Sequence, residues 1–77
     1  MKEVTTASIG KRVKAMRLQK KWTQRKLSNE ALTSEAYIGR IERGEDFSPT
    51  IFYINSIAKA LGVSTKWLLF GDEDDTT

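Results

Sequence analysis

The 77-residue sequence predicts an all-α fold in which five short helices form one compact domain. Apolar residues recur at the three- and four-residue spacing of amphipathic helices, and no segment has the apolar–polar alternation of a half-buried strand. Residue types that cap helix N-termini and glycines that end helices divide the chain at short intervals. We assign residues 1–71 to this domain. We expect the acidic segment 72–77 to be unstructured because it contains no apolar residue to anchor it.

The first helix is predicted over residues 8–20. Ile9, Val13 and Met16 recur on one side at helical spacing, so they should face the core. Much of the remaining surface is basic and comprises Lys11, Arg12, Lys14, Arg17, Lys20 and Lys21. We interpret most of these residues as a solvated outer face, because the helix lacks the large aromatic side chain that membrane-surface helices usually bury.

The second helix is predicted to begin after Thr23, a good N-cap, and to run to about Ala31, with Leu27 pointing inward. Arg25 and Lys26 stand in its first turn, where cations oppose the helix dipole. Two interpretations are open. Either these surface charges cost little, or an anion lies nearby and explains a local conflict of the kind found at functional sites.

The third helix is predicted to begin after Thr33 or Ser34 and to end before Gly44, with Ile38 and Ile41 on the side that faces the core. The opposite, exposed side carries small and charged residues, namely Glu35, Ala36, Gly39, Arg40 and Arg43. A glycine inside a helix costs about 1 kcal/mol relative to alanine. It either permits the close approach of another surface or reflects sequence drift.

The fourth helix is predicted to have Ser48 as N-cap and Pro49 in its first position, and to end at Gly62. Its apolar stripe comprises Ile54, Ile57, Ala58 and Leu61. The fifth is short, with Ser64 as N-cap and Gly71 at its end. Its packing residues are Trp67 and Leu68.

Charge is distributed unevenly along the chain. The formal net charge is +3, yet residues 11–43 contain 10 basic and 3 acidic residues, whereas residues 44–77 contain 2 basic and 6 acidic residues. A basic face indicates a polyanion such as nucleic acid or an anionic membrane surface, unless the charges merely solvate a helix. Composition alone does not decide between these interpretations.

The composition also argues against catalysis. The sequence contains no Cys and no His, which removes the common thiolate and imidazole nucleophiles, bases and metal ligands. We see no phosphate-binding loop or metal-ligand spacing, so we expect no enzyme, catalytic residue, metal, cofactor or small-molecule substrate. The absence of Cys fits a reducing cytoplasm. The longest fully apolar runs are four residues, at 51–54 and 67–70, so we expect neither a signal peptide nor a membrane span.

The second and third predicted helices are separated only by residues 32–34. Two short helices joined so tightly, the second amphipathic with a small and polar outer side, predict a helix-turn-helix. In that geometry the third helix enters the major groove of DNA. The start of the second helix then faces the phosphate backbone, which supplies an anion for Arg25 and Lys26.

Three sequence blocks resemble one family. Residues 23–27 read T-Q-R-K-L, residues 37–44 read Y-I-G-R-I-E-R-G, and residues 58–69 read A-K-A-L-G-V-S-T-K-W-L-L. These blocks are similar to the motifs of the Cro/cI-type (XRE-type) helix-turn-helix domain of bacterial and phage regulators, and the resemblance covers about residues 8–71. It implies a lambda-repressor-like DNA-binding fold.

The resemblance also implies roles for particular residues. The positions that match base-contacting ones are Glu35, Ala36 and Arg40. Those expected to contact the DNA backbone are Thr23, Gln24, Arg25, Ser34, Tyr37 and Arg43. Arg17 and Glu42 match a buried ion pair that ties the first helix to the third. Two alternatives stay open: Glu35 either accepts from cytosine or stabilises the helix N-terminus, and Tyr37 either contacts DNA or packs.

The sequence departs from the family pattern at the turn. Leu32 stands where the family usually has glycine, and Ser28 stands where it prefers alanine. Because a left-handed conformation is costly for leucine, we expect either a rearranged turn or a longer second helix. The loop 45–48 is acidic where many relatives are basic, which predicts the loss of one backbone contact.

Aromatic residues are numerous for so small a core, namely Phe47, Phe52, Tyr53, Trp67 and Phe70. They either cover the core or build a dimer surface, for which we select Phe52, Trp67 and Phe70 because the family commonly dimerises through its last two helices. A homodimer would read a palindromic operator whose half-sites lie roughly 34 Å apart.

The sequence therefore predicts a double-stranded DNA-binding transcription regulator of the phage or bacterial repressor type. Its recognition helix spans about residues 34–43. The alternative is a protein-interaction module, antitoxin-like or bridging, that uses the aromatic surface.

Overall fold

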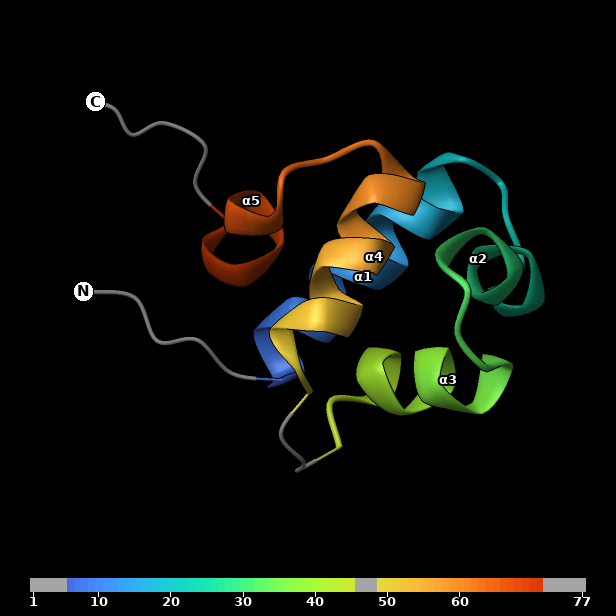
Figure 1. Cartoon of the computed structure of the whole chain (residues 1–77), viewed down its shortest axis with the longest axis horizontal. Coiled ribbons are helices and arrows are strands. Elements are labelled where there is room, and N and C mark those ends of the chain that lie inside the picture. The colour runs from blue at the N-terminus through green and yellow to red at the C-terminus, as the bar shows by residue number, and fades with distance from the viewer. Residues whose placement is uncertain (1–5, 46–48, 72–77) are drawn as a thin grey trace.

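The computed structural model of the protein describes residues 6–45 and 49–71. In these ranges it contains five α-helices and no strand, which confirms the predicted all-α fold. The helices are α1 (Thr6–Gln19), α2 (Gln24–Ala31), α3 (Glu35–Arg43), α4 (Ile51–Leu61) and α5 (Thr65–Phe70) (Figure 1). The acidic segment 72–77, Phe47 and Ser48 lie outside the described residues.

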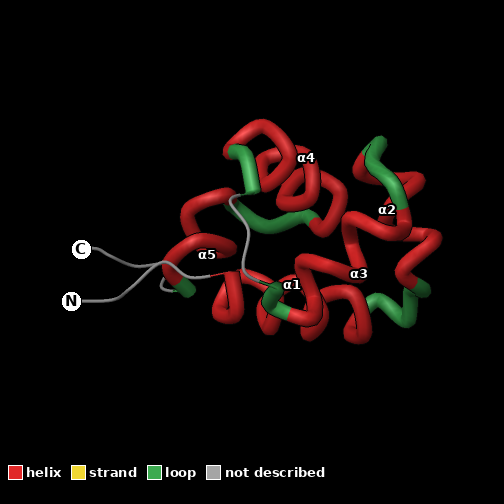
Figure 2. The backbone as a smooth tube through the Cα atoms, turned by 90° about the horizontal axis from the view of Figure 1, so that it is seen from below, coloured by secondary structure: helices red, strands yellow, loops and turns green. Residues whose placement is uncertain are grey.

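The helices are arranged around a central pair. α1 and α4 occupy the middle of the molecule, with α2 on one side and α5 on the other (Figures 1 and 2). α3 packs against α1 and α2, while α5 packs against α1 and α4. α3 is therefore held by the N-terminal half of the chain, and its outer side faces solvent.

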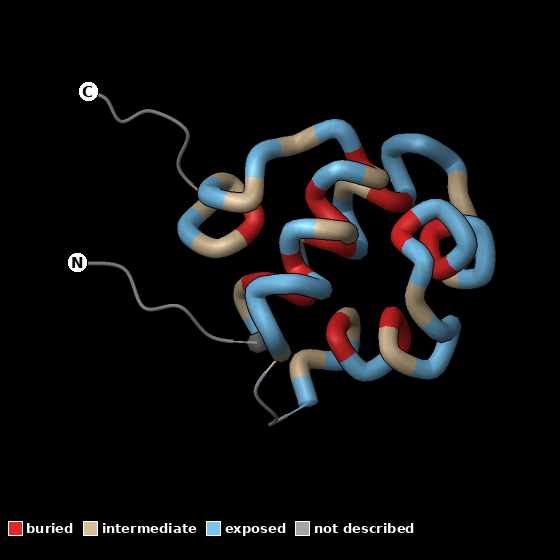
Figure 3. The backbone as a smooth tube through the Cα atoms, viewed as in Figure 1, coloured by how far each residue is buried: buried red, intermediate tan, exposed pale blue. Residues whose placement is uncertain are grey.

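The core is apolar and draws on every helix. Its buried side chains are Ile9, Val13, Leu27, Ala31, Ile38, Ile41, Ile54, Ile57, Ala58, Leu61 and Leu68. In Figure 3 the buried parts of the helices face one another across the interior. Full burial of one such large side chain contributes about 1.5–3 kcal/mol. Met16, predicted to face the core, packs only at its edge and is half-buried. No helix among the described residues is long and apolar enough to cross a bilayer.

The start of α4 differs from the prediction. The helix begins at Ile51, and its N-cap is Thr50, whose hydroxyl accepts from the backbone N–H of Tyr53 at 3.4 Å. Pro49 therefore precedes the cap instead of occupying the first helical position. Thr50 supplies both the extended backbone and the acceptor oxygen that a cap requires, so it replaces Ser48 in that role. The other predicted caps, Thr23, Ser34 and Ser64, are confirmed.

The turn between α2 and α3 also corrects the prediction. Leu32 adopts the left-handed conformation, with φ 59° and ψ 45°, so the turn is not rearranged and α2 still ends at Ala31. The backbone N–H of Thr33 donates to Ser28 O at 2.9 Å, and that of Leu32 donates to Asn29 O at 3.4 Å. These bonds satisfy the last carbonyls of α2. Leu32 is 88% exposed, so burial of its own side chain does not offset the cost of the left-handed backbone.

We expect Leu32→Gly to stabilise the protein by about 1 kcal/mol, because glycine adopts a left-handed conformation without steric cost. Leu32→Ala keeps the Cβ atom and serves as the control, so its free energy of unfolding should stay near that of the parent. Urea unfolding followed by circular dichroism measures both. A Gly variant no more stable than the Ala variant would contradict the strain at this position.

Arg12 fastens α5 to α1. Its Nε donates to Leu68 O at 2.7 Å, and its terminal Nη2 donates to Leu69 O at 2.8 Å. These carbonyls lie in the last turn of α5, where a cation is favourable. Partial burial lowers the pKa of Arg12 from its usual value. Gly71 ends α5 in the left-handed conformation, with φ 72°, which favours glycine at this position. A Cβ atom there would also stand 2.7 Å from Nη1 of Arg12, so the arginine would have to shift.

Replacing Arg12 with Met should cost about 1.5–3 kcal/mol of stability, since two hydrogen bonds from a charged donor are lost while the apolar stem is kept. Lys14→Met, an exposed position on the same helix, should change the free energy of unfolding by less than about 0.5 kcal/mol. Equal effects of the two substitutions in urea unfolding would argue against a special role of Arg12.

Candidate nucleic-acid interface

α3 has two sharply different sides. Ile38 and Ile41 are fully buried against the core. Glu35, Ala36 and Arg40 are exposed on the other side. The tight turn at residues 32–34 joins α2 to α3, and in Figure 3 the exposed parts of α3 lie on its side away from the interior. This is the geometry of a helix-turn-helix.

The structure brings Arg17 and Glu42 together in a largely buried ion pair. Nε of Arg17 lies 2.6 Å from Oε2 of Glu42, and Nη2 lies 2.9 Å from Oε1. Nη1 donates to Trp22 O at 2.7 Å. The hydrogen bond to Glu42 raises the pKa of Arg17 above its usual value. The pair joins α1 to α3, so it fixes the position of α3 on the domain.

Gln24, the first residue of α2, joins the same network. Its Nε2 donates to Oε1 of Glu42 at 3.0 Å. The Arg17–Glu42 pair therefore also holds the start of α2 against α3. The backbone N–H groups at the start of a helix have no intrahelical acceptor and form a ready site for an anion. Of these, the N–H of Lys26 is taken by the Thr23 hydroxyl at 3.0 Å.

Gly39 is buried, which corrects its predicted placement on the exposed side of α3. A Cβ atom there would stand 3.1 Å from Nη1 of Arg43 and 3.7 Å from Oε1 of Gln24. The long side chains of Arg43 and Gln24 therefore extend over the glycine. Its small size makes room for them, and no external surface is needed to explain it.

Glu45 lies just beyond α3 and pairs with two arginines of that helix. Its Oε2 lies 2.8 Å from Nε of Arg43, and its Oε1 lies 3.2 Å from Nε of Arg40. The hydrogen bond from Arg43 is the main cause that holds the pKa of Glu45 below its usual value, with a smaller contribution from Arg40. The acidic loop was visible in the sequence, but its pairing with the recognition helix was not.

The first turn of α2 contains one basic residue with intramolecular partners and one without. Nζ of Lys26 lies 3.1 Å from Oε2 of Glu30 and 5.6 Å from the ring centroid of Trp22. Arg25 is exposed and has no ion-pair partner among the described residues. Glu30 and Trp22 thus partly compensate the charge of Lys26 within the protein, whereas Arg25 remains available for an external anion.

Tyr37 packs within the protein. Its ring centroid lies 5.0 Å from that of Tyr53 on α4, and the residue is half-buried. Burial is the main cause that raises the pKa of Tyr37, and Tyr53 adds to it. Packing, one of the two roles considered for Tyr37, is therefore present, and its contact with DNA stays a prediction. The remaining backbone candidates, Thr23 and Ser34, are the exposed N-caps of α2 and α3.

A family model described as helix-turn-helix matches residues 13–68. The chain belongs to this helix-turn-helix family. The resemblance to Cro/cI-type domains is thereby confirmed.

Relatives of this helix-turn-helix chain are regulators. It is 38% identical over 72 residues to the HTH-type transcriptional regulator DicA of Escherichia coli K12. The aligned region covers 94% of this chain and 53% of DicA. The chain spans about half the length of the curated relatives it matches, at 44–60%.

Two solved structures of protein–DNA complexes are similar to this helix-turn-helix domain. The biofilm regulator SinR in complex with DNA is 31% identical, with a TM-score of 0.74 over 79% of this chain and 97% of that one. The P22 c2 repressor in complex with a synthetic operator is also 31% identical, with a TM-score of 0.76 over 83% of this chain and 96% of that one.

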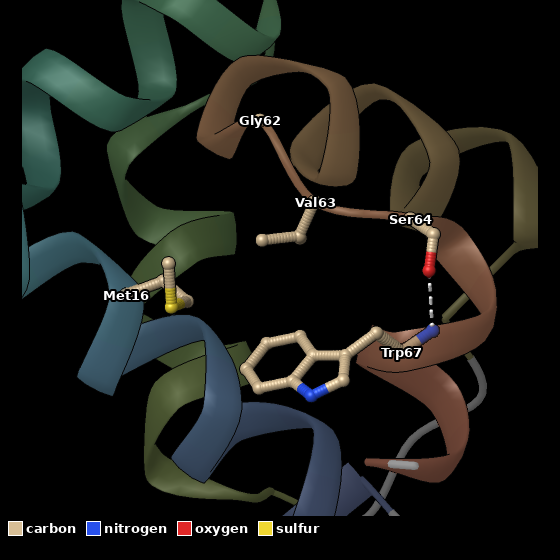
Figure 4. Close-up of a pocket in the computed structure, with 5 residues that line it drawn as sticks. All are labelled: Met16, Gly62, Val63, Ser64 and Trp67. Atoms are coloured by element: carbon tan, nitrogen blue, oxygen red, sulfur yellow. Dashed lines mark hydrogen bonds between the residues drawn. The ribbon is translucent and has the colours of Figure 1, made fainter. Parts of the chain in front are cut away.

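The residues selected for a dimer surface differ in exposure. In this helix-turn-helix domain Phe52 is 71% exposed on α4, and Phe70 is 39% exposed at the end of α5. Trp67 is half-buried and covers the core. Its indole ring also lines an open pocket of about 310 Å³ (Figure 4). The pocket is lined by Met16, Gly62, Val63, Ser64 and Trp67. The described residues contain no cluster of carboxylates that could hold a metal ion.

Proposed function

We propose that the chain is a sequence-specific, double-stranded DNA-binding transcription regulator of the repressor type. One observation carries this proposal: α3 exposes Glu35, Ala36 and Arg40 while its opposite side is locked onto the core. Such a helix can enter a major groove without disturbing the domain. The DNA complexes of the SinR and P22 c2 relatives support this reading.

The exposed side chains suit base recognition. Arg40 can form two hydrogen bonds with O6 and N7 of guanine, and Ala36 can contact a thymine methyl group. Glu35 has two uses, since its carboxylate either accepts from cytosine or stabilises the N-terminus of α3. We assign these residues to base contacts.

The surrounding residues suit contacts with phosphates. Their backbone N–H groups, hydroxyls and cations lie at the starts of α2 and α3 and along the outer side of α3, where the flanking strands would pass. They are Thr23, Gln24, Arg25, Ser34, Tyr37 and Arg43. Gln24 is already tied to Glu42 through its side chain, so its backbone N–H is the donor we assign to a phosphate.

We further propose that the chain binds a palindromic operator as a homodimer, in the cytoplasm. The exposed ring of Phe52 and the partly exposed ring of Phe70 supply apolar surface on the last two helices, and Trp67 lies nearby in α5. A duplex with two half-sites should bind much more than twice as tightly as a duplex with one, provided that the centres of the half-sites lie roughly 34 Å apart. The gain should be much smaller when the half-sites are separated by a further half helical turn. The helix-turn-helix family is not a class of enzymes, and we propose no catalysis, cofactor or small-molecule substrate.

The proposal is tested by selecting duplexes from a random pool and measuring affinity against salt. We expect one sequence to be enriched, and log K to fall with log[salt] by about 0.9 per neutralised phosphate. Arg25→Gln should make this slope shallower by about one phosphate. Lys59→Gln, with the same charge change at the far end of α4, should leave it unaltered. No enrichment, or a flat slope, would reject the proposal.

A second candidate is a protein-interaction module. The exposed Ile51 and Phe52, 61% and 71% accessible in the first turn of α4, favour it because neighbouring apolar side chains are common at protein interfaces. The discriminating result is binding of a protein partner that Phe52→Ser abolishes, together with no enrichment of any duplex.

A further inference from the structure

Glu45 places one carboxylate against two cations of the recognition helix. Because the argument concerns how Arg40 and Arg43 meet DNA, it rests on the proposed function. We propose that Glu45 is a specificity-determining residue, which weakens binding to unselected DNA more than binding to the operator by holding and partly neutralising Arg40 and Arg43.

Backbone hydrogen bonds at the end of α3 fix the position of the Glu45 backbone. Gly44 adopts the left-handed conformation that ends α3, and its N–H donates to Ile41 O at 3.0 Å. The N–H of Glu45 then donates to Arg40 O at 3.2 Å. This pair of bonds turns the chain back over the last turn of α3. The Glu45 side chain therefore begins beside the last turn of α3, and its carboxylate accepts from both arginines.

Unselected DNA is held mainly by phosphates that attract cations. With Glu45 between them, Arg40 and Arg43 present less positive charge to a phosphate, and the carboxylate itself repels one. The Glu45 oxygens lie 3.2 Å from Nε of Arg40 and 2.8 Å from Nε of Arg43, so a phosphate that approaches either guanidinium also meets a nearby negative charge. A duplex bound only through its phosphates has no base contacts that could offset this loss of affinity.

The operator differs from unselected DNA because it also offers base contacts to Arg40. Glu45 engages Nε, at one edge of each guanidinium, whereas guanine can be read end-on by the two terminal nitrogens. Arg40 can therefore contact guanine while it still pairs with Glu45. The pairing also restricts the rotamers of the long Arg40 side chain, which favours a directional contact over a diffuse one. The cost imposed by Glu45 falls mainly on unselected DNA.

The test compares Glu45→Gln with Glu30→Gln. Each substitution raises the net charge by one. Glu45→Gln removes the two exposed ion pairs with Arg40 and Arg43 on α3, whereas Glu30→Gln removes one exposed ion pair, with Lys26 on α2. Dissociation constants are measured for the selected duplex and for a scrambled duplex of equal length across a salt series. Urea unfolding of both variants confirms that their folds are intact.

For Glu45→Gln we expect the ratio of the scrambled to the selected dissociation constant to fall at least threefold. The salt slope for scrambled DNA should steepen by about one phosphate. Glu30→Gln should leave the ratio within twofold of the parent. The inference is overturned if this ratio falls less than threefold or rises for Glu45→Gln, or if it falls equally for Glu30→Gln.

The parent protein separates failure of the inference from failure of the proposed function. A parent that enriches no duplex rejects the proposed function and the role of Glu45 with it. A parent that selects its operator, beside a Glu45→Gln variant with the same ratio, rejects the role of Glu45 alone.

Discussion

Arg17→Met is expected to destabilise the domain by about 3–5 kcal/mol, the usual cost of removing one partner from a buried ion pair. The Glu42 side chain is only 3% exposed, and without Arg17 its carboxylate would keep, among the residues that the structure describes, a single hydrogen bond, from Gln24. Natural domains are stable by about 5–15 kcal/mol, and small ones lie near the lower end. The variant should therefore unfold at a much lower urea concentration than the parent, or be partly unfolded in buffer.

The double variant Arg17→Met/Glu42→Leu is the control. Replacing both members of a buried pair with apolar side chains is often nearly neutral, so it should recover much of the stability that the single variant loses. Gln24 then loses its acceptor, which limits the recovery. A single-variant loss below about 1 kcal/mol, the range of exposed pairs, would show that the Arg17–Glu42 pair does not fix α3.

The sequence predicts best those features that depend on near neighbours. The hydroxyls of Thr23, Ser34 and Ser64 cap backbone groups three residues away, so their roles can be read from spacing alone. The buried apolar stripes follow for the same reason, because helical periodicity decides which side is apolar. The sequence does not locate the start of α4, because the three consecutive residues 48–50 all favour a helix start and spacing does not rank them.

Two features that depend on the reach of long polar side chains are not predicted by residue spacing. Arg12 resembles its exposed basic neighbours in sequence, and only the return of α5, 56 residues later, gives it carbonyl partners. Helical spacing places Gly39 on the exposed side of α3, because spacing does not show that the long side chains of Arg43 and Gln24 extend over it. Both errors concern long polar side chains, whose reach exceeds what a periodic pattern describes.

Leu32 shows a different limit. Its intrinsic preference opposes the left-handed conformation, yet two backbone bonds at the end of α2 and the burial of Leu27 and Ile38 on either side of the turn require that geometry. A cost of about 1–2 kcal/mol at one residue is smaller than the gain from burying two large side chains. Tertiary packing therefore decides the turn.

Arg40→Ala should abolish the preference for guanine at one position of the selected operator while it leaves the other positions unchanged. A two-bond contact with guanine contributes about 1–3 kcal/mol of discrimination, so the preference should fall by about 5- to 150-fold. The measurement is competition between the operator and duplexes altered at one base pair at a time. Because Arg43 and Glu45 remain paired in this variant, the end of α3 keeps its shape.

Arg25→Gln provides the contrast. Arg25 lies in the first turn of α2, and we assign it to a phosphate, so its loss should weaken all duplexes by a similar factor and leave every base preference intact. If Arg40→Ala also weakens all duplexes equally, then Arg40 contacts phosphate and Glu35 and Ala36 must account for the selectivity. If instead Arg25→Gln changes a base preference, then α2 reaches the groove floor, and the assignment of α3 as the recognition helix is wrong.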